Sequence, residues 1–382
     1  MEIESIKGKK LNKGEWAEFY VLLKLLGEGR LYTADKLLRK NFSNYLDIIR
    51  VIRQELDTIP IDYIVNEGNQ TIRIEARQEV LREIPMADFR SNAVDLFNGI
   101  KDLKGNSVPA PDSVCDFARF IYVSKPKAPA VKALKKMFGG KNDIFVEVRD
   151  GQTAIVSIMG FSIKSKFGQN PTLFNAGSSS QFLYKIDNCN KDLMREFNDI
   201  SDGKNRGWSQ CKTFLQTHNM KLSFVKAQNP VYESNMFLVR ESMSKIMAWC
   251  VEDRLIHAQG NFEVKETIER MVEANPLSVP NPDVYYEKAM KDFLMAGFTG
   301  MTAAQQWDGR EQVSGGYIVV MEDGDVLCYH SADREAFRDY LFRNTHFEYV
   351  SAKKYDWSNI IEDNGEFYLP LNVSIRFNTH TR

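Results

Sequence analysis

Residues 141–165, KNDIFVEVRDGQTAIVSIMGFSIKS, decide how the centre of this chain folds. Two runs rich in β-branched and aromatic residues, 143–148 and 154–164, flank the sequence Arg-Asp-Gly-Gln at 149–152, whose composition is typical of a turn. The stretch therefore predicts two neighbouring strands joined by a short connection.

Four polar side chains of these two strands are candidates for a catalytic site. Because side chains alternate along a strand, Ser162 and Lys164 share one face of the second strand, and Asp143 and Glu147 share one face of the first. Hydrolysis of a phosphodiester needs carboxylates that hold Mg2+ and a fixed cation beside the scissile phosphate. An adjacent pair of strands would bring these groups to one metal.

The N-terminal segment predicts an amphipathic helix. Asn12 is a favourable N-cap, and apolar residues recur at helical spacing from Trp16 to Leu26. We expect Gly27 to end this helix.

The remaining patterns predict an α/β (α+β) architecture with a central mixed sheet flanked by helices. Residues 61–65 and 71–75 are expected to form a hairpin around a turn-prone sequence. Further strands are expected at 317–321, 326–330 and 366–377, and helices near 86–103, 131–138, 191–200, 206–217, 234–256, 263–273, 284–295 and 333–342.

Composition limits the kinds of partner that the chain can bind. The 382 residues suffice for two or three domains, or for one core with large insertions. Lys+Arg (50) and Asp+Glu (51) nearly cancel, so a nucleic acid would have to be held by local patches. One candidate patch is residues 124–141, which hold six lysines and no acidic residue. Such a run alone is more often the solvated face of a helix.

Several other site classes are excluded by the sequence. The five cysteines are scattered without CxxC spacing, so we expect reduced thiols and neither disulfides nor a zinc site. The histidines show no HExxH or HxH spacing, and no phosphate-binding loop of the G-x-x-x-x-G-K-[ST] type occurs. No apolar run approaches the roughly 20 residues that span a bilayer. We expect a cytoplasmic protein without a membrane partner.

The strand pair resembles the motif of PD-(D/E)XK nucleases, in which an Asp is followed, after a hairpin, by an acidic-x-Lys tripeptide. Asp143 and Lys164 match the motif, whereas Ser162 stands where Glu or Asp is usual. Some restriction enzymes that cut within CCGG-type sites also carry serine there and recruit a displaced carboxylate. The resemblance implies such a carboxylate here, with Glu18 and Glu147 as the candidates.

The predicted first helix carries a second resemblance. Residues 13–18, KGEWAE, resemble the first-helix signature of archaeal junction resolvases and related nucleases, in which the glutamate at the place of Glu18 joins the metal site. Glu15 lies one turn earlier on the same side of the helix and competes for this role. Glu18 ranks first.

The most extensive resemblance is to the HpaII family of restriction endonucleases, and it is distributed along most of the chain. The similar segments are 12–16, 20–26, 160–165, 171–176, 315–316, 322–325, 328–330, 339–341, 371–372 and 375–377. The resemblance implies a type II enzyme that uses Mg2+ to cleave double-stranded DNA at CCGG or a related short site and leaves 5′-phosphate ends. It also implies a nuclease core in residues 1–190, a helical region in 191–300, and a C-terminal α+β region in 301–382 that completes the core or recognises DNA.

A polar, donor-rich segment follows Lys164 and is the predicted DNA contact. Amides, hydroxyls and lysines of this kind contact phosphates and base edges. The predicted DNA-binding residues are Lys141, Lys166, Gln169, Asn170, Thr172, Asn175, Ser178 and Ser179. An ordinary surface loop is the alternative. The family also implies a companion DNA methyltransferase in the host, and a homodimer is possible.

Two other functions compete with restriction. The signature at 13–18 fits a structure-selective nuclease of repair or recombination, although junction resolvases are much smaller. Ser162 fits a site-specific DNA-binding protein that has lost catalysis. Mg2+-dependent cutting separates the inactive protein from both nucleases.

Overall fold

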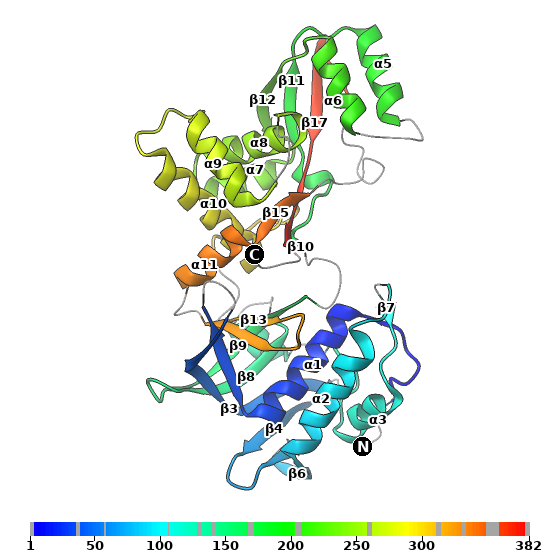
Figure 1. Cartoon of the computed structure of the whole chain (residues 1–382), viewed down its shortest axis with the longest axis vertical. Coiled ribbons are helices and arrows are strands. Elements are labelled where there is room, and N and C mark those ends of the chain that lie inside the picture. The colour runs from blue at the N-terminus through cyan, green and yellow to red at the C-terminus, as the bar shows by residue number, and fades with distance from the viewer. Residues whose placement is uncertain are drawn as a thin grey trace. The chain divides into compact units, whose positions relative to one another are not determined.

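The computed structural model describes residues 4–35, 39–56, 59–105, 107–127, 131–138, 142–166, 172–202, 208–257, 262–310, 315–330, 334–348 and 359–378. The chain divides into two compact units (Figure 1). Unit 1 contains Met1–Pro171 and Glu311–Phe337, and unit 2 contains Thr172–Arg310 and Arg338–His380. The predicted ranges 1–190, 191–300 and 301–382 follow sequence order, whereas each unit is assembled from segments that are distant in sequence.

Unit 1 is built on a mixed sheet. Its elements are β1 (Leu11–Asn12), α1 (Lys13–Glu28), β2 (Arg30–Ala34), β3 (Lys40–Leu56), β4 (Ile59–Asn66), β5 (Thr71–Ala76), β6 (Glu79–Pro85), α2 (Met86–Ile100), β7 (Ser107–Val108), α3 (Asp112–Phe120), α4 (Lys132–Phe138), β8 (Ile144–Asp150), β9 (Val156–Ser165), β13 (Gly316–Val320) and β14 (Val326–His330). The strand order is β2-β14-β13-β9-β8-β3-β4-β5-β6. The pairs β9–β13 and β14–β2 are parallel and the other neighbours are antiparallel, so the prediction of a mixed sheet is confirmed.

The predicted strand pair forms the centre of this sheet. Strands β8 and β9 are antiparallel, with Ile144 opposite Phe161 and Glu147 opposite Ile158. The predicted hairpin is also confirmed, because β4 pairs with β5. Strand β3 was missed, since the arginines and acidic residues in its second half obscure the apolar alternation. This strand is long enough to pair with β2 through its first half and with β8 and β4 through its second half.

Helix α1 begins where the sequence predicts and ends later. The Asn12 side chain accepts a hydrogen bond from the Glu15 N–H (2.8 Å), and the Glu15 carboxylate accepts one from the Asn12 N–H (3.0 Å), which is a capping box. The helix ends at Gly29, which adopts the left-handed conformation with φ 70°. The predicted end at Gly27 is therefore wrong. A Cβ at Gly27 would lie 2.9 Å from the main-chain nitrogen of Arg90 on α2, so this glycine permits the close approach of two helices.

The core of unit 1 lies between the sheet and its helices. Helices α1 and α2 pack side by side over one face of the sheet (Figure 1). Trp16 and Leu22 of α1, Val146 of β8 and Phe161 of β9 belong to this core and are fully buried. A smaller cluster on the sheet contains Phe145, with Leu134 of α4 packed against it. Neighbouring residues of β8 therefore pack into two different apolar clusters, Val146 into the main core and Phe145 into the smaller cluster.

Unit 2 combines two small antiparallel sheets with helices. Its elements are β10 (Thr172–Phe174), β11 (Phe182–Ile186), α5 (Lys191–Asp202), α6 (Trp208–Thr217), β12 (Leu222–Ala227), α7 (Pro230–Val239), α8 (Met243–Glu252), α9 (Val264–Ala274), α10 (Pro282–Thr299), β15 (Thr345–Glu348), β16 (Ile361–Asp363), β17 (Glu366–Leu371) and β18 (Ser374–Phe377). The sheet orders are β12-β11-β17-β16 and β10-β18-β15. Helix α11 (Arg334–Arg343) continues from unit 1 into unit 2.

Two features of unit 2 depart from the sequence prediction. The helix expected over 234–256 is interrupted, because Arg240 is extended (φ −168°) between α7 and α8. The strand β12 was missed within the largely helical region. Elsewhere the helices α5, α6, α9, α10 and α11 are confirmed to within a few residues. In the part of the chain that the structure describes, no helix is long and apolar enough to cross a membrane.

Substituting Gly27→Ala tests the helix contact. Alanine favours helix by about 1 kcal/mol over glycine, but the Arg90 main chain cannot move away as a flexible side chain would. We expect a net loss of about 1–2 kcal/mol in the free energy of unfolding, as for other overpacked sites. Urea unfolding measures this difference. An equal or greater stability of the variant would show that α2 does not approach α1 this closely.

Candidate active site

Asp143 lies immediately before β8 and is bound to the neighbouring strand β9. Its N–H donates to the Phe161 carbonyl (2.8 Å). Its Oδ2 atom accepts from the Ile163 N–H (2.8 Å) and from the Ser162 hydroxyl (3.0 Å). Both of these bonds fall on one oxygen of the carboxylate. Oδ1 is therefore the atom that a cation would use.

Ser162 occupies the position where the nuclease motif usually has an acidic residue. The side chain is buried, and its hydroxyl donates to Asp143. A neutral hydroxyl cannot supply the charge of the missing carboxylate. In this structure Ser162 instead orients the carboxylate that is present.

Glu18 projects from α1 and is 8% exposed. Its Oε1 atom lies 3.4 Å from the ammonium nitrogen of Lys127, and its Oε2 atom is buried without a hydrogen-bond partner among the described residues. The pKa of Glu18 is raised to about 7. Burial is the largest cause, the negative charge of Asp143 adds to it, and Lys127 opposes both. Glu18 and Asp143 are therefore close enough to interact, although one comes from a helix and the other from the sheet.

This donor set fits a divalent cation. Buried polar atoms normally have partners, so the orphaned Glu18 oxygen is costly unless a ligand uses it. Mg2+ is commonly held by one or two carboxylates and completes its coordination with water and phosphate oxygens. Among the described residues, no group of three or more Asp, Glu, His or Cys side chains forms a ready-made metal site. The pair Glu18 and Asp143 matches the two-carboxylate arrangement.

The two other glutamates considered as ligands are occupied elsewhere. Glu15 closes the capping box of α1. The Glu147 carboxylate is 2.6 Å from the Arg50 guanidinium, which also reaches Asp62 at 3.3 Å. Glu147 is four residues along β8 from Asp143, which corresponds to about 13 Å of strand. The structure does not bring Glu147 to Glu18.

Lys164 lies on β9 two residues after Ser162. The two side chains share a face of the strand, as the spacing predicts. Lys164 is half-buried and lies opposite Val319 of the parallel strand β13. Its sequence position matches the lysine of the nuclease motif, and its role as the fixed cation stays a prediction.

The structure adds groups that the sequence reasoning did not single out. Lys127 is one of the six lysines in the basic run, and its contact with Glu18 is a tertiary feature without a local signal. Arg53 and Glu55 of β3 form a buried ion pair, and the charge of Arg53 also acts on Glu18. Charged residues at alternate positions of an apolar strand were the only signal that could have revealed this pair.

The predicted DNA-contacting residues that the structure describes belong to two different units. Lys166 belongs to unit 1, where burial lowers its pKa. Thr172, Asn175, Ser178 and Ser179 belong to unit 2, in which Asn175 and Ser178 are exposed. Lys141, Gln169 and Asn170 lie outside the described residues. The DNA contacts stay predictions.

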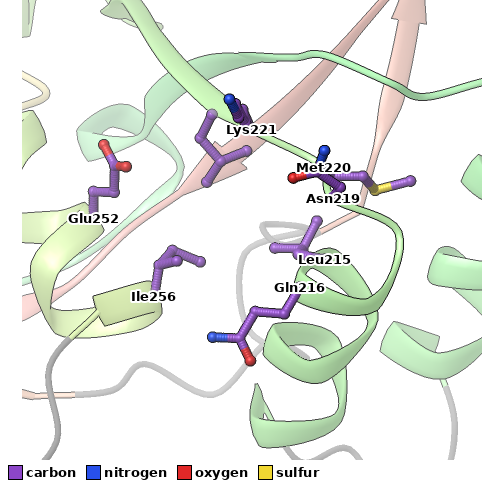
Figure 2. A pocket seen from close by; sticks show the side chains of 8 residues that line it. Leu215, Gln216, Asn219, Met220, Lys221, Glu252 and Ile256 are labelled. Carbon is purple, nitrogen blue, oxygen red and sulfur yellow. The ribbon is translucent and has the colours of Figure 1, made fainter.

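A pocket in unit 2 has a different character. The pocket has a volume of about 440 Å³ and lies between α6, the loop that leads from it into β12, and the segment from Glu252 to Ile256. Figure 2 shows the side chains that line it. Leu215 and Ile256 line it together with Lys221 and Glu252. Its lining includes a single carboxylate, so it lacks the paired ligands found at Glu18 and Asp143.

The two carboxylates and the strand lysine are of the residue types that the nuclease motif predicts. A family model described as HpaII restriction endonuclease matches residues 12–377. Type II restriction enzyme HpaII of Haemophilus parainfluenzae is 32% identical over 368 residues, which cover 96% of this chain and 98% of that enzyme. No solved structure matches significantly. The chain belongs to the HpaII restriction endonuclease family.

The raised pKa of Glu18 predicts a pH dependence of stability. Between the ordinary value of 4.5 and about 7, the folded protein keeps a proton that the unfolded chain has lost. Stability is therefore lost as pH rises through this window. Glu18→Gln stays neutral, so metal-free wild type should lose on the order of 2 kcal/mol relative to this variant between pH 4.5 and pH 8. Urea unfolding of both proteins in EDTA measures it, and parallel curves would contradict the buried position of Glu18.

Proposed function

We propose that this restriction endonuclease is a type II enzyme with a PD-(D/E)XK core. It hydrolyses double-stranded DNA in an Mg2+-dependent reaction at CCGG or a related short site and leaves 5′-phosphate ends. The observation that carries the proposal is the electrostatic interaction of Glu18 with Asp143, which relates two carboxylates from different elements. Lys164 is included because it matches the lysine of the nuclease motif on β9. The specificity for a CCGG-type site rests on family membership, and the core type rests on the motif of β8 and β9.

Each residue of the site has a distinct role in this mechanism. Glu18 and Asp143 would hold Mg2+, which would supply positive charge against the phosphate and make a water molecule more acidic. Ser162 keeps the Asp143 carboxylate in place through its hydroxyl. Lys164 holds a non-bridging oxygen of the phosphate or orients the attacking water. The water oxygen bonds to phosphorus while the bond to the 3′ oxygen breaks, and this leaves a 3′-hydroxyl and a 5′-phosphate.

Recognition of DNA is assigned to residues outside this set. Lys166 and the polar residues between Thr172 and Ser179 would contact phosphates and base edges. Lys141, Gln169 and Asn170 are included in the same proposal. A host that makes such an enzyme needs a companion DNA methyltransferase to protect its own sites. Two copies of the chain would cut the two strands of a symmetric site.

The direct test is cleavage of unmethylated phage DNA by the purified protein, with Mg2+ and separately with EDTA, followed by sequencing of the fragment ends. We expect discrete fragments that require Mg2+ and share one terminal sequence with a 5′-phosphate. Cleavage confined to branched DNA would instead support a repair or recombination nuclease. Intact DNA despite site-specific binding would support a protein that has lost catalysis.

Lys164→Ala tests the fixed cation. Loss of one positively charged group that stabilises the developing charge should lower the cleavage rate at least about 100-fold. Affinity for a duplex with the cleaved sequence, measured with Ca2+ in place of Mg2+, should fall far less than the cleavage rate, because a duplex is held by several phosphate contacts of which Lys164 would be one. Lys10→Ala, which removes an exposed lysine, is the matched control. Cleavage by Lys164→Ala at the rate of the control would remove Lys164 from the mechanism.

A further inference from the structure

A buried ion pair on β3 holds the chain segment that leads to the active site. Arg53 Nε donates to Glu55 Oε1, and the two side chains are 3% and 0% exposed. The other oxygen of Glu55 accepts from both the N–H and the hydroxyl of Ser124, each at 2.9 Å. Arg53 Nη2 donates to the carbonyls of Lys125 (2.8 Å) and Pro126 (3.3 Å). Three consecutive residues are therefore bound by one pair.

The residue after this segment is Lys127, whose ammonium group reaches Glu18. The Lys127 side chain is 59% exposed, yet its nitrogen lies 3.4 Å from Glu18 Oε1. The charge of Asp143 also acts on Lys127. An exposed lysine side chain normally samples many conformations. Here the three residues before Lys127 are bound to a buried pair, which limits where its side chain starts and favours its contact with Glu18.

Stability alone is a weak reason for such a pair. Burying two charges carries a desolvation cost that can exceed their mutual attraction, and apolar residues of similar size are often at least as stabilising. Beyond their own contact, Arg53 Nη2 and the second oxygen of Glu55 bind residues 124–126, through three main-chain groups and the Ser124 hydroxyl. Their position is therefore best explained by the segment that they fix.

We propose that Lys127 is a phosphate-binding residue of the active site and that Arg53 and Glu55 are the positioning residues that hold it there. This inference rests on the proposed cleavage of DNA. A phosphodiester that enters for hydrolysis brings negative charge to Glu18 and Asp143. The Lys127 ammonium group already lies 3.4 Å from Glu18 and feels the charge of Asp143, and its exposed side chain is accessible to a duplex.

Phosphate binding by Lys127 is measured through the salt dependence of DNA binding. Each phosphate contact contributes about one unit to the slope of log Kobs against log salt concentration. For a duplex with the cleaved sequence and Ca2+ in place of Mg2+, Lys127→Met should reduce this slope by about one. Lys10→Ala should retain the wild-type slope. A wild-type slope for Lys127→Met overturns the proposal.

The positioning role is measured with a double-mutant cycle. Lysine cannot make the forked contacts of arginine, so Arg53→Lys should reduce the slope and the cleavage rate as Lys127→Met does. In the Lys127→Met background, Arg53→Lys should have no further effect on either quantity. Arg73→Lys is the matched control, since Arg73 and Glu75 form the same i, i+2 pair on β5 with a separation of 2.6 Å.

The outcomes separate the two proposals. Arg53→Lys could change the slope and the cleavage rate equally in the wild-type and Lys127→Met backgrounds. That result overturns the positioning role, because a merely structural pair acts independently of Lys127. If Arg53→Lys fails to fold, Glu55→Gln replaces it and keeps one acceptor for Ser124. Wild type that cuts DNA while Lys127→Met keeps the full slope overturns this inference alone. Wild type that neither binds nor cuts duplex DNA overturns the proposed function as well.

Discussion

The structure depends on the attachment of Asp143 to β9. Hydrogen bonds from the Ile163 N–H and the Ser162 hydroxyl fix one oxygen of its carboxylate, and the Asp143 N–H is bound to the Phe161 carbonyl. These contacts align the end of β8 with β9, and they use Oδ2 of the carboxylate rather than Oδ1. Asp143 is therefore held to the sheet through one oxygen, and in the proposed mechanism Ser162 orients this carboxylate instead of supplying a second one.

The site is assembled from three sources that meet around this aspartate. Helix α1 contributes Glu18, one of whose oxygens is buried without a hydrogen-bond partner in the part of the chain that the structure describes. The segment that precedes α4 contributes Lys127, and β9 contributes Lys164. Because the carboxylates of Glu18 and Asp143 repel each other, a positive charge placed beside them is favourable. Lys127 brings positive charge to Glu18, while burial and the charge of Asp143 raise the pKa of Glu18 to about 7.

The candidate site could be predicted from the sequence in part. Asp143, Ser162 and Lys164 were found because a hairpin brings residues close in sequence onto one face. Glu18 was found through a resemblance in residues 13–18, since its distance along the chain from Asp143 carries no spacing signal. Glu147 lies four residues after Asp143 and so is expected on the same face of the strand. This spacing does not reveal that Arg50 of β3 forms an ion pair with the Glu147 carboxylate.

Local patterns in the sequence were sufficient for the cap of α1, the hairpin of β4 and β5, and the pair of β8 and β9. Each depends on hydrogen bonds or apolar periodicity within a short stretch of chain. Only the tertiary structure decided that β9 pairs in parallel with β13 and that the chain divides into two units. The hydrogen bonds from Arg53 and Glu55 to the residues before Lys127 were likewise visible only in the structure. These contacts join residues far apart in sequence, and their energy comes from burial and charge pairing that no local periodicity records.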